Sequence, residues 1–115
     1  MSDAPVMTMT VVDDYDAADD FAKKHTPMID TMSLADGKTA VVVTVGRDVP
    51  HPNAPDHFIG WIGVWAGDSE VARFDLSAVA TDPKVSVVLT VDPGTKVTAV
   101  ESCNLHGLFT YSVMV

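Results

Sequence analysis

The sequence predicts an all-β protein, an immunoglobulin-like antiparallel β-sandwich of about seven strands. Segments rich in β-branched and aromatic residues recur along the chain, and turn signals separate them at intervals of about 8–12 residues. Almost no segment has a helical pattern. A parallel sheet is not expected, because parallel strands need long crossover connections, which are usually helical. The 115 residues, 47% of them hydrophobic, fit a single domain with a real core.

The expected elements follow one another in chain order. Residues 8–12 form a short first strand or an extended arm. Residues 16–24 can form a turn or two of helix, with acidic residues first and lysines last, as the helix dipole favours. Pro27 ends the helix, because the residue before a proline prefers extended geometry. The segment 57–65 is apolar on both faces, so it is expected to be buried on both sides or to line an interface. Strands are predicted over residues 28–32, 39–45, 57–65, 70–76, 84–91, 96–102 and 109–115.

Charge and composition argue against several classes of function. The net charge is −9 with only seven lysines and arginines, so no nucleic-acid partner is expected, because phosphate binding needs a basic face. The sequence has no apolar run of about 18 residues, so no membrane span is expected. Residues 1–5 lack the start of a signal peptide, which favours a cytoplasmic protein. The single cysteine, Cys103, rules out an internal disulfide and a four-cysteine metal centre.

The stretch Cys103-Asn104-Leu105-His106-Gly107 places a thiol and an imidazole three residues apart, where both can bind one metal ion. A buried cysteine beside a surface histidine is the simpler interpretation of this stretch alone. His25, His51 and His57 lie outside the predicted strand interiors, and prolines near His25 and His51 restrict the backbone there. A sandwich collects its loops at two ends, so these side chains can converge on Cys103. Four imidazoles and a thiolate suit iron or copper better than calcium or magnesium.

Three motifs carry a family resemblance that extends from Lys24 to the C-terminus. They are Lys24-His25-Thr26-Pro27-Met28-Ile29, the stretch 45–53 that runs on to 56–62, and Cys103-Asn104-Leu105-His106-Gly107-Leu108-Phe109. In this order and spacing the chain resembles the superoxide reductases of the one-iron neelaredoxin kind, and it is similar to the catalytic domain of desulfoferrodoxin. The resemblance implies a single iron-binding domain over residues 1–115, in which residues 1–22 form an N-terminal arm or loop.

The resemblance further implies one mononuclear iron site per chain. His25, His51, His57 and His106 would be the equatorial nitrogen ligands and Cys103 the axial sulfur ligand, with the sixth position open to superoxide. In the implied reaction ferrous iron, superoxide and two protons give ferric iron and hydrogen peroxide, and no dioxygen is released. An axial thiolate supports this chemistry because it donates electron density to iron, as in some haem enzymes.

Two lysines precede the first motif histidine. Lys24 occupies the position of a family lysine and is expected to attract the superoxide anion in spite of the net charge; an ordinary solvated lysine is the alternative. Lys23 departs from the family, in which many members have a glutamate that closes the sixth position of the oxidised iron. Water or hydroxide is the expected replacement, and Asp20 is a second candidate. Residues 1–21 contain no cysteine, so the four-cysteine centre of the two-iron relatives is not expected there. A rubredoxin-like external electron donor is therefore implied, and relatives imply a homo-oligomer, either dimer or tetramer.

Other classes of protein use similar residues. A non-catalytic electron-transfer protein of the blue-copper type also combines cysteine and histidine in a β-sandwich, but four histidines exceed its pattern. A structural zinc site is normally closed with four ligands. A cysteine hydrolase would need His106 to activate Cys103, and their adjacency in one loop favours chelation instead. Metal content, together with a visible ferric–thiolate band that Cys103→Ser removes, would distinguish these classes.

Overall fold

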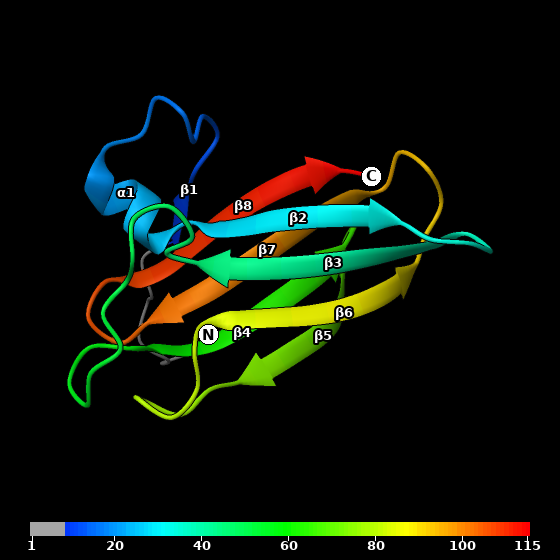
Figure 1. Ribbon diagram of the computed structural model, residues 1–115. Coiled ribbons are helices and arrows are strands. Elements are labelled where there is room, and N and C mark those ends of the chain that lie inside the picture. Colours follow the sequence, from blue (N-terminus) through cyan, green and yellow to red (C-terminus); the bar gives the residue numbers. More distant parts are fainter. Residues whose placement is uncertain (1–8) are drawn as a thin grey trace, which may run out of the picture.

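The computed structural model describes residues 9–115 and consists of strands and one short helix (Figure 1). Its elements are β1 (Met9–Val11), α1 (Asp20–His25), β2 (Pro27–Ser33), β3 (Lys38–Val45), β4 (Ile59–Ala66), β5 (Ser69–Asp75), β6 (Lys84–Thr90), β7 (Lys96–Cys103) and β8 (Gly107–Met114). Five strands form one sheet in the order β1-β8-β7-β4-β5, and three form the other in the order β2-β3-β6. Within the described residues, no helix has the length and apolar character needed to cross a membrane.

The predicted all-β sandwich is confirmed, and residues 9–115 contain eight strands and one parallel pair. β1 lies parallel to β8, with Met9 opposite Leu108 and Val11 opposite Thr110. This pair was not predicted, because the sequence offers no helical crossover. The first and last strands need none, since the whole domain between them serves as the connection. Two predictions concern residues outside the described part of the chain. They are the start of the first strand at residue 8 and the expected lack of a signal peptide in residues 1–5.

The core lies between the two sheets, and alternation of buried residues along the strands builds it. Val41 and Val43 of β3 face Val97 and Ala99 of β7 in one buried cluster, and Cys103 at the end of β7 belongs to the same cluster. The cysteine therefore lies in the core, at the end of an interior strand of the sheet. Its position is fixed by packing rather than by a flexible loop.

The strand predicted to be buried on both faces is fully buried on one. A register irregularity between Ile59 and Trp61 places Ile59 with Ile62 on the inner face, which the predicted alternation did not anticipate. The outer face carries Trp61 and Trp65, which are partly exposed. The guanidinium of Arg73 lies over the Trp61 ring, 4.0 Å from its centroid, and covers part of this surface.

One end of the sandwich carries the helix and two of the loops (Figure 1). The carboxylate of Asp19 caps α1 by accepting a hydrogen bond of 2.8 Å from the backbone N–H of Ala22, and the basic residues of the helix lie in its last turn. The helix ends at His25 because Pro27 begins β2. The loop after β3 and the turn between β7 and β8 lie at the same end, so that all segments with histidines meet there.

Candidate metal centre

Side chains from the helix, the β3–β4 loop and the β7–β8 turn meet at this end of the sandwich. Potential ligand atoms of His25, His57, Cys103 and His106 all lie within 4.8 Å of one another. His51 adds a fifth, because its Nε2 lies 3.5 Å from Cys103 Sγ. The structure thus brings together all five residues that the sequence proposes as ligands, although they span residues 25–106 of the chain.

His25 is completely buried at the end of α1. Its Nδ1 lies 2.7 Å from the carbonyl oxygen of Phe21, so Nδ1 carries the proton and donates it to this carbonyl. The free Nε2 then points into the cluster, 3.1 Å from Nδ1 of His106. Phe109 stacks on the ring, with centroids 4.6 Å apart. Burial lowers the pKa of His25, which keeps the imidazole neutral and able to bind a metal.

His51 is held in the same way at the start of the β3–β4 loop. Its Nδ1 donates to the carbonyl of Pro52 over 2.6 Å, which leaves Nε2 free beside Cys103. Burial is the main cause that lowers the pKa of His51 to about 4. The imidazole is therefore neutral at physiological pH, and no proton competes with a metal for Nε2.

Gly46 allows the tight approach of this loop. Its φ is +76°, and a Cβ there would overlap the backbone nitrogen of His51. We expect Gly46→Ala to destabilise the metal-free protein by about 2 kcal/mol or more, measured by chemical denaturation, because strain in the left-handed region adds to the overlap. The matched control is Gly94→Ala, which has φ +87° but open space around the added methyl. Equal losses in the two variants would contradict the steric role of Gly46.

His57 precedes β4 and is oriented by its neighbours in the chain. Asn104 holds both of them, since its Oδ1 accepts from the N–H of Phe58 at 2.8 Å and its Nδ2 donates to the carbonyl of Asp56 at 2.9 Å. The Nε2 atom of His57 is buried and has no hydrogen-bond partner among the described residues. Such an orphaned nitrogen is costly unless it binds something. Sequence reasoning did not give Asn104 this role, although its place inside the cysteine–histidine motif was the available signal.

Cys103 and His106 flank the tight turn that follows β7. The thiol is 1% exposed, and burial raises its pKa, so the metal-free protein keeps it protonated. His106 is exposed, and its Nδ1 lies 3.7 Å from Cys103 Sγ. The cluster therefore has one face in the core and one face reachable from solvent. A small ion can enter from the solvent side while the sulfur remains shielded.

Glu101 is a buried acid that sequence reasoning missed. It is fully buried on the inner face of β7, two residues before Cys103, and neither carboxyl oxygen has a hydrogen-bond partner within residues 9–115. Burial raises the pKa of Glu101 to about 9. The nearby backbone N–H of Cys103 lowers this pKa by a smaller amount, although it is not placed to form a hydrogen bond. The available signal was its inward position in the alternation of the predicted strand. Glu101 is therefore neutral at pH 7 in the metal-free protein.

Lys24 lies beside the cluster as the penultimate residue of α1 and is half-buried. Its charge contributes to the lowered pKa values of His25 and His51, although burial is the larger cause for both. The lysine charge therefore acts on the imidazoles across a short distance. Asp20 is exposed at the start of the helix, and among residues 9–115 no carboxylate belongs to the ligand cluster.

The donor set of one sulfur and four imidazole nitrogens fits a transition metal. Nε2 of His25, His51 and His57, Nδ1 of His106 and Sγ of Cys103 are the atoms left free by the surrounding hydrogen bonds. Soft sulfur and borderline nitrogen ligands suit iron, copper or zinc, and they do not suit calcium or magnesium. A metal would also satisfy the orphaned nitrogen of His57.

Comparisons with known proteins identify the family of the chain. The family model described as Desulfoferrodoxin matches residues 17–112. A relative from Thermotoga maritima is 35% identical over 117 residues, covering 84% of this chain and 89% of the relative. Neelaredoxin from Megalodesulfovibrio gigas is 31% identical, covering 88% of this chain and 93% of its own length.

A solved structure gives the same result. The superoxide reductase (neelaredoxin) from Archaeoglobus fulgidus in the reduced form superposes with a TM-score of 0.76 at 28% identity, covering 93% of this chain and 97% of that one. The resemblance carried by the three motifs is thus confirmed over most of the chain. The chain belongs to the desulfoferrodoxin family, the family of the superoxide reductases and neelaredoxin.

Proposed function

We propose that this protein is a superoxide reductase with one iron ion per chain. The observation that carries the proposal is the meeting of one thiol and four imidazoles at a solvent-reachable end of the sandwich. Membership of the desulfoferrodoxin family supports the same activity. When bound, iron would supply the electron that converts superoxide, with two protons, to hydrogen peroxide.

In this proposal His25, His51 and His57 bind iron through Nε2, His106 through Nδ1, and Cys103 through Sγ. The fixed tautomers of His25 and His51 support these assignments, because Phe21 and Pro52 accept the other ring proton. Cys103 must lose its thiol proton when the metal binds, so the affinity for metal rises with pH. Its position in the core then keeps water away from the sulfur.

Lys24 would draw the superoxide anion to the site, which the acidic protein otherwise repels. We expect Lys24→Ala to lower the second-order rate constant of the ferrous protein with superoxide by about tenfold, and to weaken its dependence on ionic strength. Pulse radiolysis at several salt concentrations measures both. Lys96→Ala, at the start of β7 and so at the opposite end of that strand from Cys103, is the matched control. Equal effects of the two substitutions on the rate constant would show that the net charge, and not the position of Lys24, determines the rate.

In this proposal, water or hydroxide would occupy the sixth ligand position of the oxidised iron. Lys23 stands where the family resemblance leads one to expect a glutamate, and the ligand cluster of the described residues contains no carboxylate. If Asp20 were a substitute, Asp20→Ala would change the visible spectrum of the oxidised protein and its pH dependence. We expect both to stay unchanged, because Asp20 is exposed at the far end of the helix from His25.

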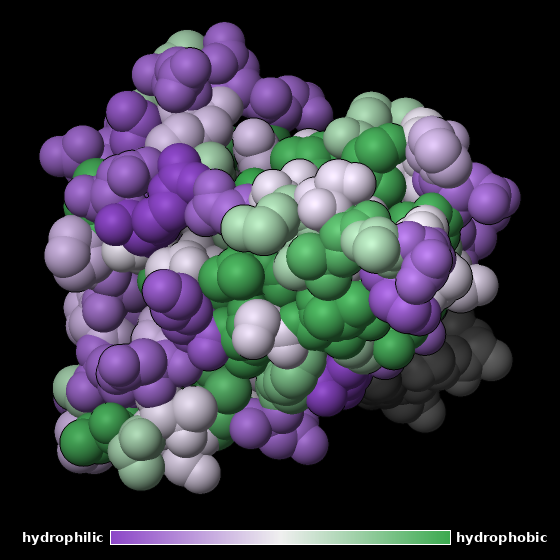
Figure 2. Space-filling model, turned by 45° about the vertical axis from the view of Figure 1, so that its right-hand side comes forward, coloured by the Kyte–Doolittle hydropathy of each residue, from purple (hydrophilic) through white to green (hydrophobic). Residues whose placement is uncertain are grey.

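We further propose a rubredoxin-like electron donor and a homo-oligomer, either dimer or tetramer. Figure 2 shows a hydrophobic area beside hydrophilic residues on the protein surface. Exposed hydrophobic side chains among the described residues include Met32, Val88 and Met114. Such exposure supports association with another protein surface, which sedimentation of the iron-loaded protein tests. A cytoplasmic location is part of the proposal, because the reaction needs a free thiol and a reduced donor; cell fractionation tests it.

The decisive experiment adds superoxide to the anaerobic ferrous protein and measures hydrogen peroxide and dioxygen together. Peroxide without dioxygen is the expected result and identifies a reductase. Stoichiometric dioxygen would identify a dismutase. The second candidate, a non-catalytic electron-transfer protein, is favoured only by the cysteine–histidine donor set in a β-sandwich. It predicts only the peroxide and dioxygen of spontaneous dismutation, and tightly bound copper in protein produced with iron available would support it.

A further inference from the structure

The loop between β3 and β4 carries two histidines of the cluster, and hydrogen bonds hold it at three places. Asn53 anchors its middle to the β5–β6 connection, since its Oδ1 accepts from the N–H of Val79 over 2.7 Å. Asn104 anchors its end on both sides of His57. The third place is near its start, where Arg47 contacts Asp30 and Asp48 contacts Tyr15. Among the described residues, only the contact of Asp48 reaches the segment that precedes His25.

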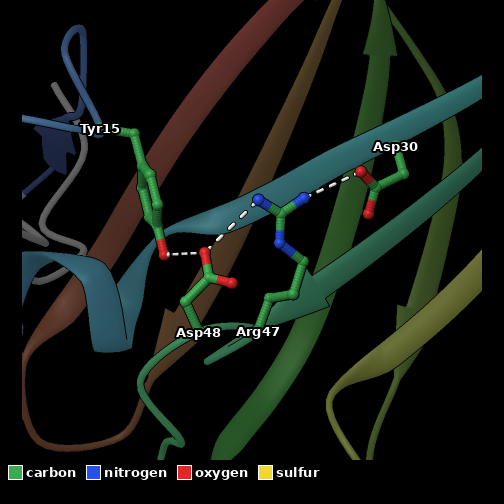
Figure 3. A network of polar contacts seen from close by, with 4 residues as sticks. All are labelled: Tyr15, Asp30, Arg47 and Asp48. Atoms are coloured by element: carbon green, nitrogen blue, oxygen red, sulfur yellow. Dashed lines mark hydrogen bonds and ion pairs between the residues drawn. The ribbon is translucent and has the colours of Figure 1, made fainter.

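Asp48 is held by the hydroxyl group of Tyr15, which donates to its Oδ2 over 2.6 Å (Figure 3). This distance is typical of a strong O–H···O⁻ hydrogen bond. Arg47 lies between two carboxylates and extends the network, with its guanidinium 2.8 Å from Asp30 of β2 and 3.4 Å from Asp48. The network thus joins the segment before α1, the strand after α1 and the loop of His51.

The ring of Tyr15 belongs to the packing around His25. It is buried in a cluster with Val12, Met28 and Phe109, and Phe109 is the residue that stacks on His25. One side chain therefore packs into the surroundings of His25 through its ring and holds the loop of His51 through its hydroxyl. Burial, followed by the hydrogen bond to Asp48, raises the pKa of Tyr15 to about 12, so this hydroxyl keeps its proton throughout the physiological range.

Lys23 is also part of this network. Its ammonium lies over the Tyr15 ring, 5.5 Å from the centroid, and its charge contributes, after the hydrogen bond of Tyr15 and the contacts of Arg47, to the lowered pKa of Asp48. Lys24, the next residue, instead acts on the imidazoles of His25 and His51. The two adjacent lysines thus have separate partners. Lys23 interacts with Tyr15 and Asp48.

We propose that Tyr15 is a positioning residue of the metal site. Its hydroxyl group, through Asp48, holds the His51 loop against the last turn of α1 and fixes the separation of His25 and His51. The inference rests on the proposed function, because it assigns Tyr15 to the geometry of that same site. It concerns only side chains of this chain, so a metal other than iron can test it.

The test measures the affinity of the metal-free protein for Co²⁺ through the cobalt–thiolate absorption. We expect Tyr15→Phe and Asp48→Ala each to weaken the affinity by about tenfold, as the loss of an outer hydrogen-bond partner of a metal site typically does. The double variant should lose no more than Asp48→Ala alone, because Asp48→Ala already removes the bond that Tyr15 donates. Tyr111→Phe, which packs against the same cluster, is the matched control with no expected change.

At saturating Co²⁺ the thiolate band of Tyr15→Phe should differ from that of the wild type in position or intensity. A loss of stability alone would leave the saturated spectrum unchanged, and that result would overturn the positioning role. Unaltered affinity in Tyr15→Phe, or independent losses that multiply in the double variant, would overturn it too. Cobalt binding does not depend on superoxide chemistry. A wild type that gives only the peroxide and dioxygen of spontaneous dismutation would therefore refute the proposed function and leave the role of Tyr15 standing.

Discussion

Replacing Cys103 by serine is expected to remove the visible thiolate absorption of the oxidised, iron-loaded protein and to slow its reaction with superoxide by about 100-fold or more. Loss of an outer partner of a metal site typically costs about 10–100-fold in affinity or activity, and Cys103, the only cysteine of the chain, would be a direct ligand. A hydroxyl at this position keeps the volume but not the electron donation of a thiolate. Absorption spectra and pulse radiolysis of the ferrous variant measure the two effects.

Thr98→Ser is the control for Cys103→Ser, because it lies on the same strand and retains a hydroxyl group for its contact with Ser112. Its spectrum and rate should match those of the wild type. A visible band that persists in Cys103→Ser would mean that another group causes the colour. A rate that stays within about threefold of the wild type would show that sulfur ligation is dispensable, and the proposed ligand set would then be wrong.

Glu101→Gln is expected to change how the stability of the metal-free protein depends on pH. The carboxyl pKa is about 9 in the folded protein, against 4.5 for an ordinary glutamate, so between these values the folded protein holds a proton that the unfolded chain has lost. The stability that this proton supplies is complete below pH 4.5 and is lost as the pH rises through about 9. The slope is about 1.4 kcal/mol per pH unit, which gives a loss of about 2 kcal/mol from pH 7 to pH 8.5.

Chemical denaturation of the metal-free protein at pH 7 and pH 8.5 measures this loss, and Glu101→Gln should abolish most of it because an amide does not ionise. His25 and His51 affect the result little between pH 7 and pH 8.5. Burial lowers their pKa values, so they reduce the stability of the folded protein only when the pH falls below about 6.5. Glu70→Gln is the matched control, an exposed glutamate paired with Arg73. If Glu101→Gln retained the full pH dependence, the buried carboxyl would not be its source.

The residues that meet at the candidate site could be predicted because they are of types that bind metals. A thiol and an imidazole in one motif, together with three further histidines beside prolines or strand ends, restrict the possibilities strongly. The sandwich could be predicted from alternation, as in β3. The prediction of which residues of β4 face inward was wrong near Ile59. A register irregularity there changes the alternation, and no sequence pattern indicates this irregularity.

The supporting residues could not be predicted because their roles depend on contacts between distant segments. Tyr15 and Asp48 are 33 residues apart, and nothing in either neighbourhood indicates that they meet. Glu101 looks like an ordinary strand acid until its burial is known. Pairing of β1 with β8 joins residues about as far apart as the chain permits. Periodicity describes each segment alone, whereas these roles arise only from tertiary packing.

The parallel pairing of β1 with β8 has a consequence for how the protein folds. Closing so long a loop costs chain entropy that local contacts do not repay, so pairs of this kind form late in folding. The antiparallel hairpin of β7 and β8, which carries Cys103 and His106, can assemble from neighbouring residues. His25 joins them only when the amino-terminal part of the chain docks, because it lies 81 residues before His106. The complete set of donors therefore exists only near the end of folding, so a half-folded chain offers a metal a hairpin with two ligands rather than a finished site.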